Sequence, residues 1–294
     1  MTKIFTSLKL TSVITFIVLT IVVAPVSFAK SKSEKKETLR VLYWNIQNGM
    51  WAGQPEKYES FVEWIRAQDP DICIVAEAAQ IYYDGTNTQM PNEDRYLPAH
   101  WGELCARWGH DYHVVTPRRP STASYNFGLT NYPQAVTSRY PIDSIYIVKG
   151  HKPDSVVVNY SGWYQVVDQV VLLQENPDKE LWIMAGDFNS YSGKDNYIYK
   201  WNDVDKAFQT QDYMTLQSPF FDLVSEYYPD VFMPTCGNLR IDYMYVSKPV
   251  LRACTNVIAQ PDSYTKRVNS GVDKFYIPSD HYPIIAEFKI SKLK

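Results

Sequence analysis

The sequence predicts a mixed α/β sandwich, and three patterns support this prediction. Many short strand-like segments follow one another with helical segments between only some of them, which is typical of a sandwich rather than of a doubly wound sheet. Two of these segments, residues 72–76 and 181–185, are apolar at every position, as are strands that are buried on both faces. Residues 58–65 have the apolar spacing of a helix with one buried face.

The first half of the chain gives a strand, a helix and a second strand. Residues 39–46 (LRVLYWNI) are rich in β-branched and aromatic side chains, and this strand ends near the polar Asn45. Residues 58–65 then repeat apolar side chains at i, i+3, i+4 and i+7, and Pro70 prevents the helix from continuing. The buried strand at 72–76 follows directly.

The second half again contains apolar strands that carry polar residues. Residues 181–185 lead into Asp187, and residues 240–247 (RIDYMYVS) carry Asp242 inside a strand-like segment. A closing strand covers residues 282–290. Shorter strand candidates lie at residues 112–115, 134–138, 144–148, 155–158 and 163–167.

The first 29 residues have the pattern of a secretory signal peptide, which predicts a secreted or periplasmic protein. Two lysines flank the start of an apolar stretch (residues 10–23), and small residues at 27–29 provide a cleavage site. An uncleaved anchor is the alternative, but this stretch is shorter than the roughly 20 residues of a spanning helix. We expect no membrane span after cleavage, a flexible polar linker at 30–38, and one monomeric domain at 39–294.

The charge and the cysteines argue against several classes of protein. The formal net charge of −3 becomes −5 when Lys3 and Lys9 leave with the signal peptide, so the charge implies no stable nucleic-acid complex. The four cysteines form no CxxC pair, which disfavours a zinc ribbon or a disulfide scaffold. Cys73 is expected to be a buried thiol, whereas a bridge between Cys236 and Cys254 stays open. The many aromatic residues predict a large core, although exposed rings also stack on sugars or bases.

Polar side chains occur at the ends of several apolar strands. Burying a carboxylate or an amide costs free energy unless the group is paired or binds a ligand, and ligand crevices form at strand ends in α/β sheets. Each residue alone also fits a turn, a cap or an ion pair. Together they predict one cleft. The set is Asn45, Glu77, Asp187, Asn189, Asp280 and His281.

The donor atoms of this set suit a hard divalent cation. Oxygen ligands with few histidines favour Mg²⁺, Mn²⁺ or Ca²⁺. Zinc sites use histidines and cysteines at short spacing, and the sequence contains no such cluster. A serine nucleophile is disfavoured because no GxSxG turn is present.

Six motifs follow one another along the chain: WNI at 44–46, the strand-terminal Glu77, SRYPI at 138–142, GDFNS at 186–190, RIDYMYV at 240–246 and SDHYPI at 279–284. In these motifs the chain resembles the endonuclease/exonuclease/phosphatase superfamily. Taken together, the motifs are specific because they occur in family order. The resemblance implies a deoxyribonuclease I-like fold, a four-layer αββα sandwich of two mixed β-sheets flanked by helices.

The resemblance also implies a metal-dependent phosphoesterase, in which water attacks a phosphoryl group in line. On the metal side it implies Glu77 as the principal ligand of Mg²⁺, Mn²⁺ or Ca²⁺. It implies that Asn45 lies beside Glu77 and fixes metal and phosphate, and that Asp280 completes the metal side.

On the water side, the resemblance implies that Asp187 orients or deprotonates the attacking water. It implies that Asn189 hydrogen-bonds the developing charge. It further implies that His281 contacts a phosphoryl oxygen and that the carboxylate of Asp242 holds His281 in orientation.

One family element has no counterpart in the sequence. Members of the family carry, upstream of the GDFN strand, a strand that ends in a catalytic histidine and then a long helix. Here no histidine lies between His151 and His281, and only thirteen residues, 168–180, separate the strand candidate at 163–167 from the GDFN strand that begins at residue 181. His110, His113 and His151 are candidates for this role by residue type alone.

The shortened segment leaves two hypotheses open. The first is an active phosphoesterase, and the alternative is a catalytically impaired homologue that binds a phosphorylated or glycan ligand in the same cleft. The shortening also leaves a vacant place in the sheet, which the strand at 163–167 is a candidate to fill. The substrate stays open among nucleic acid, phospholipid, inositol phosphate and small phosphoesters. Two interpretations of Arg118 and Arg119 stay open: they bind a phosphate group of the substrate, or they are a pair of solvated surface side chains.

Overall fold

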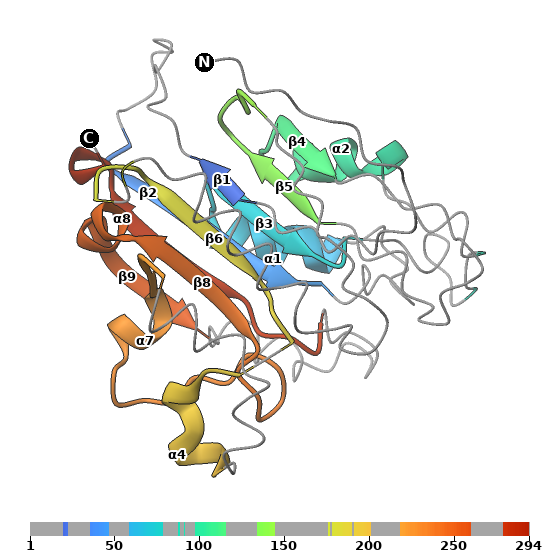
Figure 1. Ribbon diagram of the computed structural model, residues 1–294. Coiled ribbons are helices and arrows are strands. Elements are labelled where there is room, and N and C mark those ends of the chain that lie inside the picture. Colours follow the sequence, from blue (N-terminus) through green and yellow to red (C-terminus); the bar gives the residue numbers. More distant parts are fainter. Residues whose placement is uncertain are drawn as a thin grey trace, which may run out of the picture.

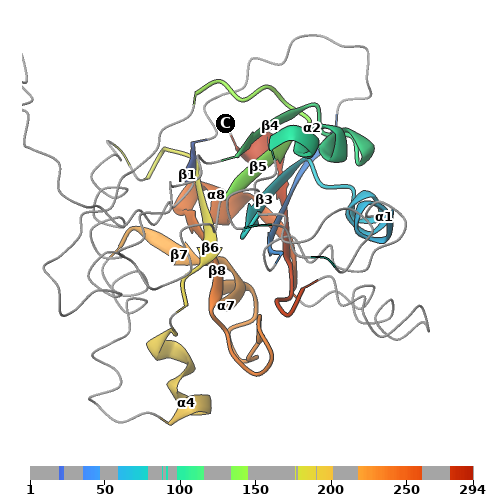
Figure 2. The ribbon, with the colours of Figure 1, turned by 90° about the vertical axis from the view of Figure 1, so that its right-hand side faces the viewer.

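Two β-sheets pack face to face in this computed structural model. The structure describes residues 20–22, 36–46, 59–78, 88, 91, 98–115, 134–144, 176, 178–189, 191–200, 218–259 and 279–293. Turned by 90°, the ribbon shows helix α1, the larger sheet and the smaller sheet as successive layers (Figures 1 and 2). The predicted sandwich of two sheets is confirmed.

The larger sheet has six strands in the order β4-β5-β3-β2-β10-β9. Strands β2 and β3 are parallel, and every other neighbouring pair is antiparallel, so this sheet is mixed. The strands are β2 (Thr38–Asn45), β3 (Ile72–Ala76), β4 (Tyr112–Val115), β5 (Ala135–Ser138), β9 (Cys254–Ala259) and β10 (Ile284–Lys289).

The smaller sheet has the order β1-β6-β8-β7, and its described strands are antiparallel. They are β1 (Thr20–Val22), β6 (Trp182–Asp187), β7 (Phe220–Asp222) and β8 (Asp242–Ser247). β1 lies within the predicted signal peptide, and in the full chain it pairs with the edge of β6 that faces away from β8. The strand predicted at 163–167 lies outside the described residues.

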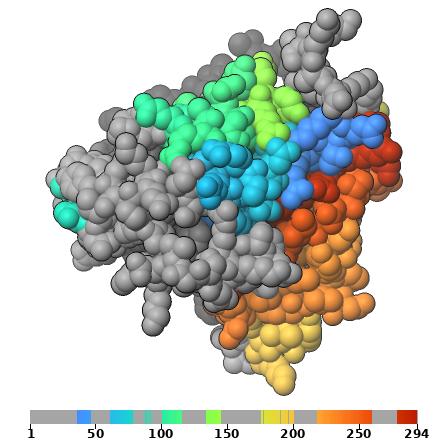
Figure 3. Space-filling view, turned by 180° about the vertical axis from the view of Figure 1, so that it is seen from behind, coloured from blue at the N-terminus to red at the C-terminus, as the bar shows by residue number. Residues whose placement is uncertain are grey.

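Two helices, α1 (Glu59–Gln68) and α2 (Pro98–Arg107), pack against the larger sheet. The sequence predicts α1, whose Phe61, Val62 and Ile65 are buried. Seen from behind, the segments that contain α1 and α2 lie side by side on one face (Figure 3). The other helical segments within the described residues are η2 (Gly193–Asp195), α4 (Asn196–Tyr199), α7 (Leu223–Tyr227), α8 (Lys248–Ala253) and η3 (Ile290–Lys292).

Strand β2 shows how the layers are built, because its alternate side chains enter two different cores. Leu39, Val41 and Tyr43 belong to the core between the two sheets. Leu42 and Trp44 point the other way, into the core under α1 and α2. Successive side chains of a strand point to opposite faces, so a strand apolar at both sets of positions must be covered on both faces.

Several further expectations can be compared with the structure. The strands expected at 72–76, 112–115 and 134–138 are present, the last one from Ala135. The strands expected at 144–148 and 155–158 fall largely or wholly outside the described residues. Within the described part of the chain, no helix is long and apolar enough to cross a membrane.

All four cysteines are free thiols, so Cys236 and Cys254 form no bridge in this structure. Cys73 is fully buried, as predicted. Burial raises the pKa of the Cys73 thiol to about 12, which keeps it protonated and unreactive.

Candidate active site

The alternation of β2 places two polar side chains between the sheets. Tyr43 belongs to the core between the sheets, and Asn45, two residues later, points to the same face. Both residues are fully buried. Asn45 is the last residue of the strand, so its amide lies at the end of this core.

Strand β3 runs parallel to β2 with Ala76 beside Asn45, so Glu77 emerges next to the Asn45 amide. The Asn45 Nδ2 atom donates to Glu77 Oε1 over 3.2 Å. Glu77 has a φ angle of 53°, a left-handed conformation that is unfavourable for a residue with a Cβ atom. Strained backbone of this kind is concentrated at functional sites.

Two carboxylates come from the opposite sheet. Asp187 ends β6 and pairs directly with Asp242, which begins β8. Ala185 and Met244, two residues further into these strands, belong to the core between the sheets, so both carboxylates face the larger sheet. Antiparallel pairing thus brings two acids that are 55 positions apart in sequence to one place.

The turn after β6 fixes Asp187 from its own side. The Asn189 backbone N–H donates to Asp187 Oδ1 over 2.8 Å, and its side-chain amide donates to Asp187 Oδ2 over 3.1 Å. Asn189 also has a positive φ, 46°, and its side chain is exposed. Asn45 donates to Asp187 Oδ2 over 3.0 Å from the other sheet.

Two hydrogen bonds hold the segment that carries His281 against the end of β2, and a third lies within the segment. The hydroxyl of Ser279 donates to the Asn45 carbonyl over 2.6 Å and accepts from the His281 backbone N–H over 3.0 Å. The indole N–H of Trp44 donates to the His281 carbonyl over 2.9 Å. The imidazole is therefore delivered to the same end of the core.

The imidazole of His281 lies among the carboxylates. Its Nδ1 lies 2.7 Å from Asp242 Oδ2, and Asp242 Oδ1 accepts from the Tyr43 hydroxyl over 2.8 Å. On the other side of the ring, Nε2 lies 3.5 Å from Asn45 Nδ2, 4.0 Å from Asp187 Oδ2 and 3.9 Å from Asp280 Oδ1. The Asp280 side chain is 52% exposed, so it stands at the entrance of the site.

The cluster is strongly coupled electrostatically. Burial raises the pKa of Asp187 to about 7, and the charge of Asp242 adds to this rise. Burial also raises the pKa of Glu77. Burial alone would lower the pKa of His281, but the hydrogen bond and the charge of Asp242, with Asp187 and Asp280, raise it to about 9. At neutral pH the imidazole is therefore a cation among acids.

All seven residues that the sequence singled out are described, and the structure brings them to one end of the sandwich. Six form a hydrogen-bonded group, and Asp280 stands beside it. The residues are Asn45, Glu77, Asp187, Asn189, Asp242, Asp280 and His281.

The three histidines considered for the missing family position do not join this group. His110 is fully buried elsewhere, with Nδ1 2.7 Å from Thr137 Oγ1 and Nε2 2.8 Å from the Pro70 carbonyl. His113 lies exposed on β4, with its ring against Gly102 of α2. His151, like Arg118 and Arg119, lies outside the described residues.

Two residues lie next to the site although no sequence pattern placed them there. Tyr43 supports Asp242 through its hydroxyl, and only the alternation of β2 would have placed it on that face. Cys236 lies beside His281 because the two residues form an isolated antiparallel bridge, which links segments 45 positions apart. The sequence alone does not predict this pairing.

Two facing sheets thus gather carboxylates, an amide and an imidazole at one end of an α/β sandwich. The sequence profile of the Endonuclease/Exonuclease/phosphatase family matches residues 42–281, and the chain belongs to this family. Members of the family hydrolyse phosphoesters and typically use divalent metals.

Solved structures show the same fold at low sequence identity. An endonuclease/exonuclease/phosphatase from Beutenbergia cavernae is 15% identical, with a TM-score of 0.54, 86% of this chain and 72% of that chain covered. An AP endonuclease from Archaeoglobus fulgidus is 15% identical, with a TM-score of 0.51 and coverage of 85% and 99%. A 3′-5′ exonuclease from Neisseria meningitidis is 17% identical, with a TM-score of 0.52 and coverage of 85% and 100%. A comparison with curated proteins gave no match.

Proposed function

We propose that this chain is a secreted, divalent-metal-dependent phosphoesterase that uses the cluster around Asp187 and His281. The observation that carries the proposal is the convergence of the hydrogen-bonded group at one end of the sandwich. Four strand ends from two sheets and the segment at 279–281 supply it. A structural role alone gives no reason to gather four carboxylates within reach of one imidazole.

The donor set fits a hard divalent cation. Glu77 and Asp187 are carboxylates whose pKa values burial raises, so a nearby cation would favour their charged forms. Asn45 and Asp280 add amide and carboxylate oxygens, which Mg²⁺, Mn²⁺ and Ca²⁺ prefer. Glu77, Asn45 and Asp280 would hold the ion, and a bound divalent ion would neutralise charge on the phosphoryl oxygens.

The chain's own residues would then accept the proton of the attacking water and stabilise the negative charge that develops on the phosphoryl group. Asp187, fixed by Asn189 and Asn45, is placed to orient a water molecule and, in its charged form, to accept the proton of that water. The His281 imidazolium, held by Asp242, presents Nε2 as a donor to a phosphoryl oxygen. The exposed side chain of Asn189 supplies a further amide for the developing charge.

Hydrolysis of bis(p-nitrophenyl) phosphate with Mg²⁺ or Mn²⁺ tests this proposal. We expect Asp187→Asn to lower kcat by about 10²- to 10⁴-fold, the usual contribution of a general base. Asp178→Asn is the matched control, because Asp178 is 75% exposed and pairs with Lys248 at the surface. Equal rates for wild type and Asp187→Asn would refute the proposed mechanism.

The substrate and the location are part of the same proposal and need separate measurements. A panel of nucleic acid, phospholipid, inositol phosphate and small phosphoesters, assayed with the purified domain, would identify the substrate class. Tight binding of a phosphorylated or glycan ligand without turnover would instead support the impaired homologue. Secretion predicts a mature protein that begins at Lys30, and mass spectrometry of the exported protein showing an intact residue 1 would contradict it.

A further inference from the structure

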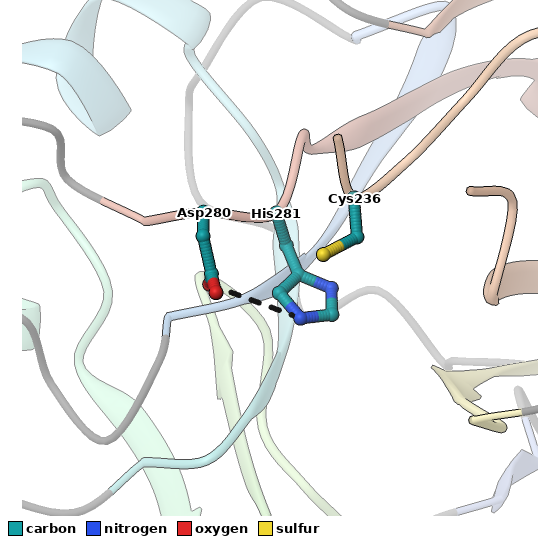
Figure 4. A group of neighbouring side chains, drawn as sticks. All are labelled: Cys236, Asp280 and His281. Atoms are coloured by element: carbon teal, nitrogen blue, oxygen red, sulfur yellow. Dashed lines mark ion pairs between the residues drawn. The ribbon is translucent and has the colours of Figure 1, made fainter. Parts of the chain in front are cut away.

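Cys236, Asp280 and His281 offer three different donor atoms at the mouth of the site. One ligand atom from each residue, a sulfur, a carboxylate oxygen and a ring nitrogen, lies within 4.8 Å of the other two. Figure 4 shows the sulfur of Cys236 and the carboxylate of Asp280 on either side of the His281 ring. Asp280 Oδ1 is 3.9 Å from His281 Nε2.

The donor types distinguish this group from the set around Glu77. A thiolate and an imidazole are poor ligands for Mg²⁺ but preferred ligands for Zn²⁺. Zinc also accepts a carboxylate oxygen, so all three groups suit one zinc ion. Of the proposed magnesium ligands, Glu77 and Asn45 offer only oxygen and amide donors, and Asp280 is common to both sites. The thiolate and the imidazole are therefore the donors that select zinc.

The surroundings of His281 favour binding of a metal through Nε2. Asp242 Oδ2 lies 2.7 Å from Nδ1, so the carboxylate keeps a proton on Nδ1, and a metal that displaces the other ring proton binds through Nε2. In zinc sites, a histidine that binds the metal through one ring nitrogen commonly donates the N–H of the other nitrogen to a carboxylate. The Tyr43 hydroxyl donates to the other oxygen of Asp242 and fixes its orientation.

Closing the three atoms around one ion requires only small movements. Ligand atoms bound to zinc at about 2.0 to 2.3 Å lie roughly 3.3 to 3.8 Å from one another, so separations within 4.8 Å must shrink by at most about 1.5 Å. The Asp280 side chain is 52% exposed and Cys236 is half-buried, so both can rotate. The backbone bridge between Cys236 and His281 already holds two of the ligands together.

We propose that Cys236, Asp280 and His281 form a zinc site at the entrance of the active site, and that zinc bound there inhibits the enzyme. On binding, the thiol of Cys236 and the Nε2 atom of His281 each release a proton to solvent, and a water molecule fills the fourth position. The inhibition rests on the proposed function, because zinc on Nε2 removes the donor that faces the phosphoryl group. The binding itself does not depend on that function.

Cobalt(II) substitution in the purified, metal-free full chain tests the binding. Cobalt in such a site gives a thiolate-to-cobalt charge-transfer band in the near ultraviolet, and zinc displaces it. We expect one cobalt ion per chain with this band. We expect Cys236→Ser to lose the band and to weaken zinc binding at least about tenfold in a chelator competition.

Two further variants complete this binding experiment. Cys254→Ser is the matched control and should keep the band, because Cys254 lies on β9, where its thiol donates to the Asn256 carbonyl. Asp280→Asn changes an exposed side chain, so folding is unaffected, and it should keep the band while weakening zinc binding. Cobalt binding without the band, or an unchanged zinc affinity in both Cys236→Ser and Asp280→Asn, would overturn the site.

A zinc titration of phosphodiester hydrolysis at saturating Mg²⁺ tests the inhibition. Each variant is compared with its own zinc-free rate, and we expect Cys236→Ser to need at least about ten times more zinc for half-inhibition. An equal zinc sensitivity of wild type and Cys236→Ser would overturn the inhibitory role. Absence of any hydrolysis would contradict the proposed function, while the cobalt band would still decide the zinc site.

Discussion

Asp242 is the residue on which the imidazole of the candidate site depends. Its side chain is buried, and each oxygen has one partner, the Tyr43 hydroxyl or the Nδ1 atom of His281. Because the Tyr43 hydroxyl donates to Oδ1 of Asp242, the Oδ2 atom of Asp242 is directed at the imidazole ring of His281. Asp242 thus acts as a positioning residue, whereas His281 faces the open part of the site.

Replacing Asp242 with Asn should remove the negative charge beside Nδ1 of His281 while the side chain keeps its size and shape. The amide carries no charge, so the pKa of His281 should fall well below its value of about 9. The amide can also donate to Nδ1 and favour the wrong tautomer, and we expect kcat to fall about 10²- to 10⁴-fold, as in other carboxylate–histidine pairs. NMR titration of His281 and steady-state kinetics check the two effects.

The exposed Asp230 provides the control for this variant, since Asp230→Asn removes a charge that takes part in none of the described hydrogen bonds of His281. An Asp242→Asn protein with an unshifted His281 titration would show that Asp242 does not set the protonation of the ring. A merely structural role would lower stability and leave the titration of the folded protein in place.

His110 has a structural role that gives the protein a distinct pH response. Burial lowers the pKa of His110 below its ordinary value, so the folded protein holds a neutral ring between Thr137 and Pro70. The unfolded chain binds a proton near pH 6.5. Stability from this group is therefore complete above about pH 6.5 and declines as the pH falls toward the lower folded pKa.

Urea unfolding of wild type and His110→Gln at pH 7.5 and pH 5.5 measures this contribution. At pH 7.5 the variant should be less stable by about 1 to 3 kcal/mol, because it disturbs two buried hydrogen bonds. The difference should shrink at pH 5.5, since only the wild type loses the histidine contribution there. A difference that is equal at both pH values would contradict the assigned burial of a neutral ring.

At the scale of elements, Arg240 ties η2 and the junction of β7 and α7 to the start of β8. Its Nε donates to Asp195 of η2 over 2.7 Å, and Nη1 donates to Asp222 over 2.6 Å. Asp222 is also the N-cap of α7 and accepts from Ser225. The guanidinium lies over the Tyr243 ring, 4.8 Å from its centre. The turn segments next to Asp187 and the helix α7 thus share one buried cation.

Arg240→Met should destabilise the fold by about 3 to 5 kcal/mol, because it leaves Asp195 and Asp222 buried without their partner. Urea unfolding measures this loss. Arg252→Met is the matched control, since Arg252 is exposed in α8 and its replacement should change stability by less than about 0.5 kcal/mol. Equal effects of the two substitutions would refute the role of the buried ion pairs.

The elements were predictable where apolar patterns were long, and the exceptions have physical causes. β3 and β6 are apolar at nearly all positions because both faces are covered. Helix α2 was missed, although Trp101, Leu104 and Cys105 have helical spacing and are buried. Strand β9 was missed because its exposed edge residues give no apolar run.

The residues of the candidate site were predictable from strand ends and family motifs, but the partners that hold these residues in place were not. The polar residues could be named because each interrupts or ends an apolar strand. Their partners depend on register and backbone conformation, as with the pairing of Asp187 and Asp242 and the positive φ of Glu77. Cys236 reaches His281 through a bridge between distant segments, which no local pattern predicts.

At the scale of the whole molecule, each of the two sheets supplies part of the site. The larger sheet supplies Asn45 and Glu77, and the smaller sheet supplies Asp187 and Asp242. The hydrogen bond from Asn45 to Asp187 crosses between the sheets, so packing of the sandwich and assembly of the site are the same event. Loss of sheet packing should therefore abolish the site before individual strands unfold.

The central claim is that this shared end of the sandwich hydrolyses phosphodiesters with the help of a divalent metal. The most direct measurement is the rate of bis(p-nitrophenyl) phosphate hydrolysis against Mg²⁺ concentration, for chelator-treated wild type and Glu77→Gln. We predict no turnover without metal, full recovery of the wild type with Mg²⁺, and at least about tenfold more Mg²⁺ for half-activation of Glu77→Gln. Turnover that persists after chelation, or identical Mg²⁺ curves for the two proteins, would contradict the account.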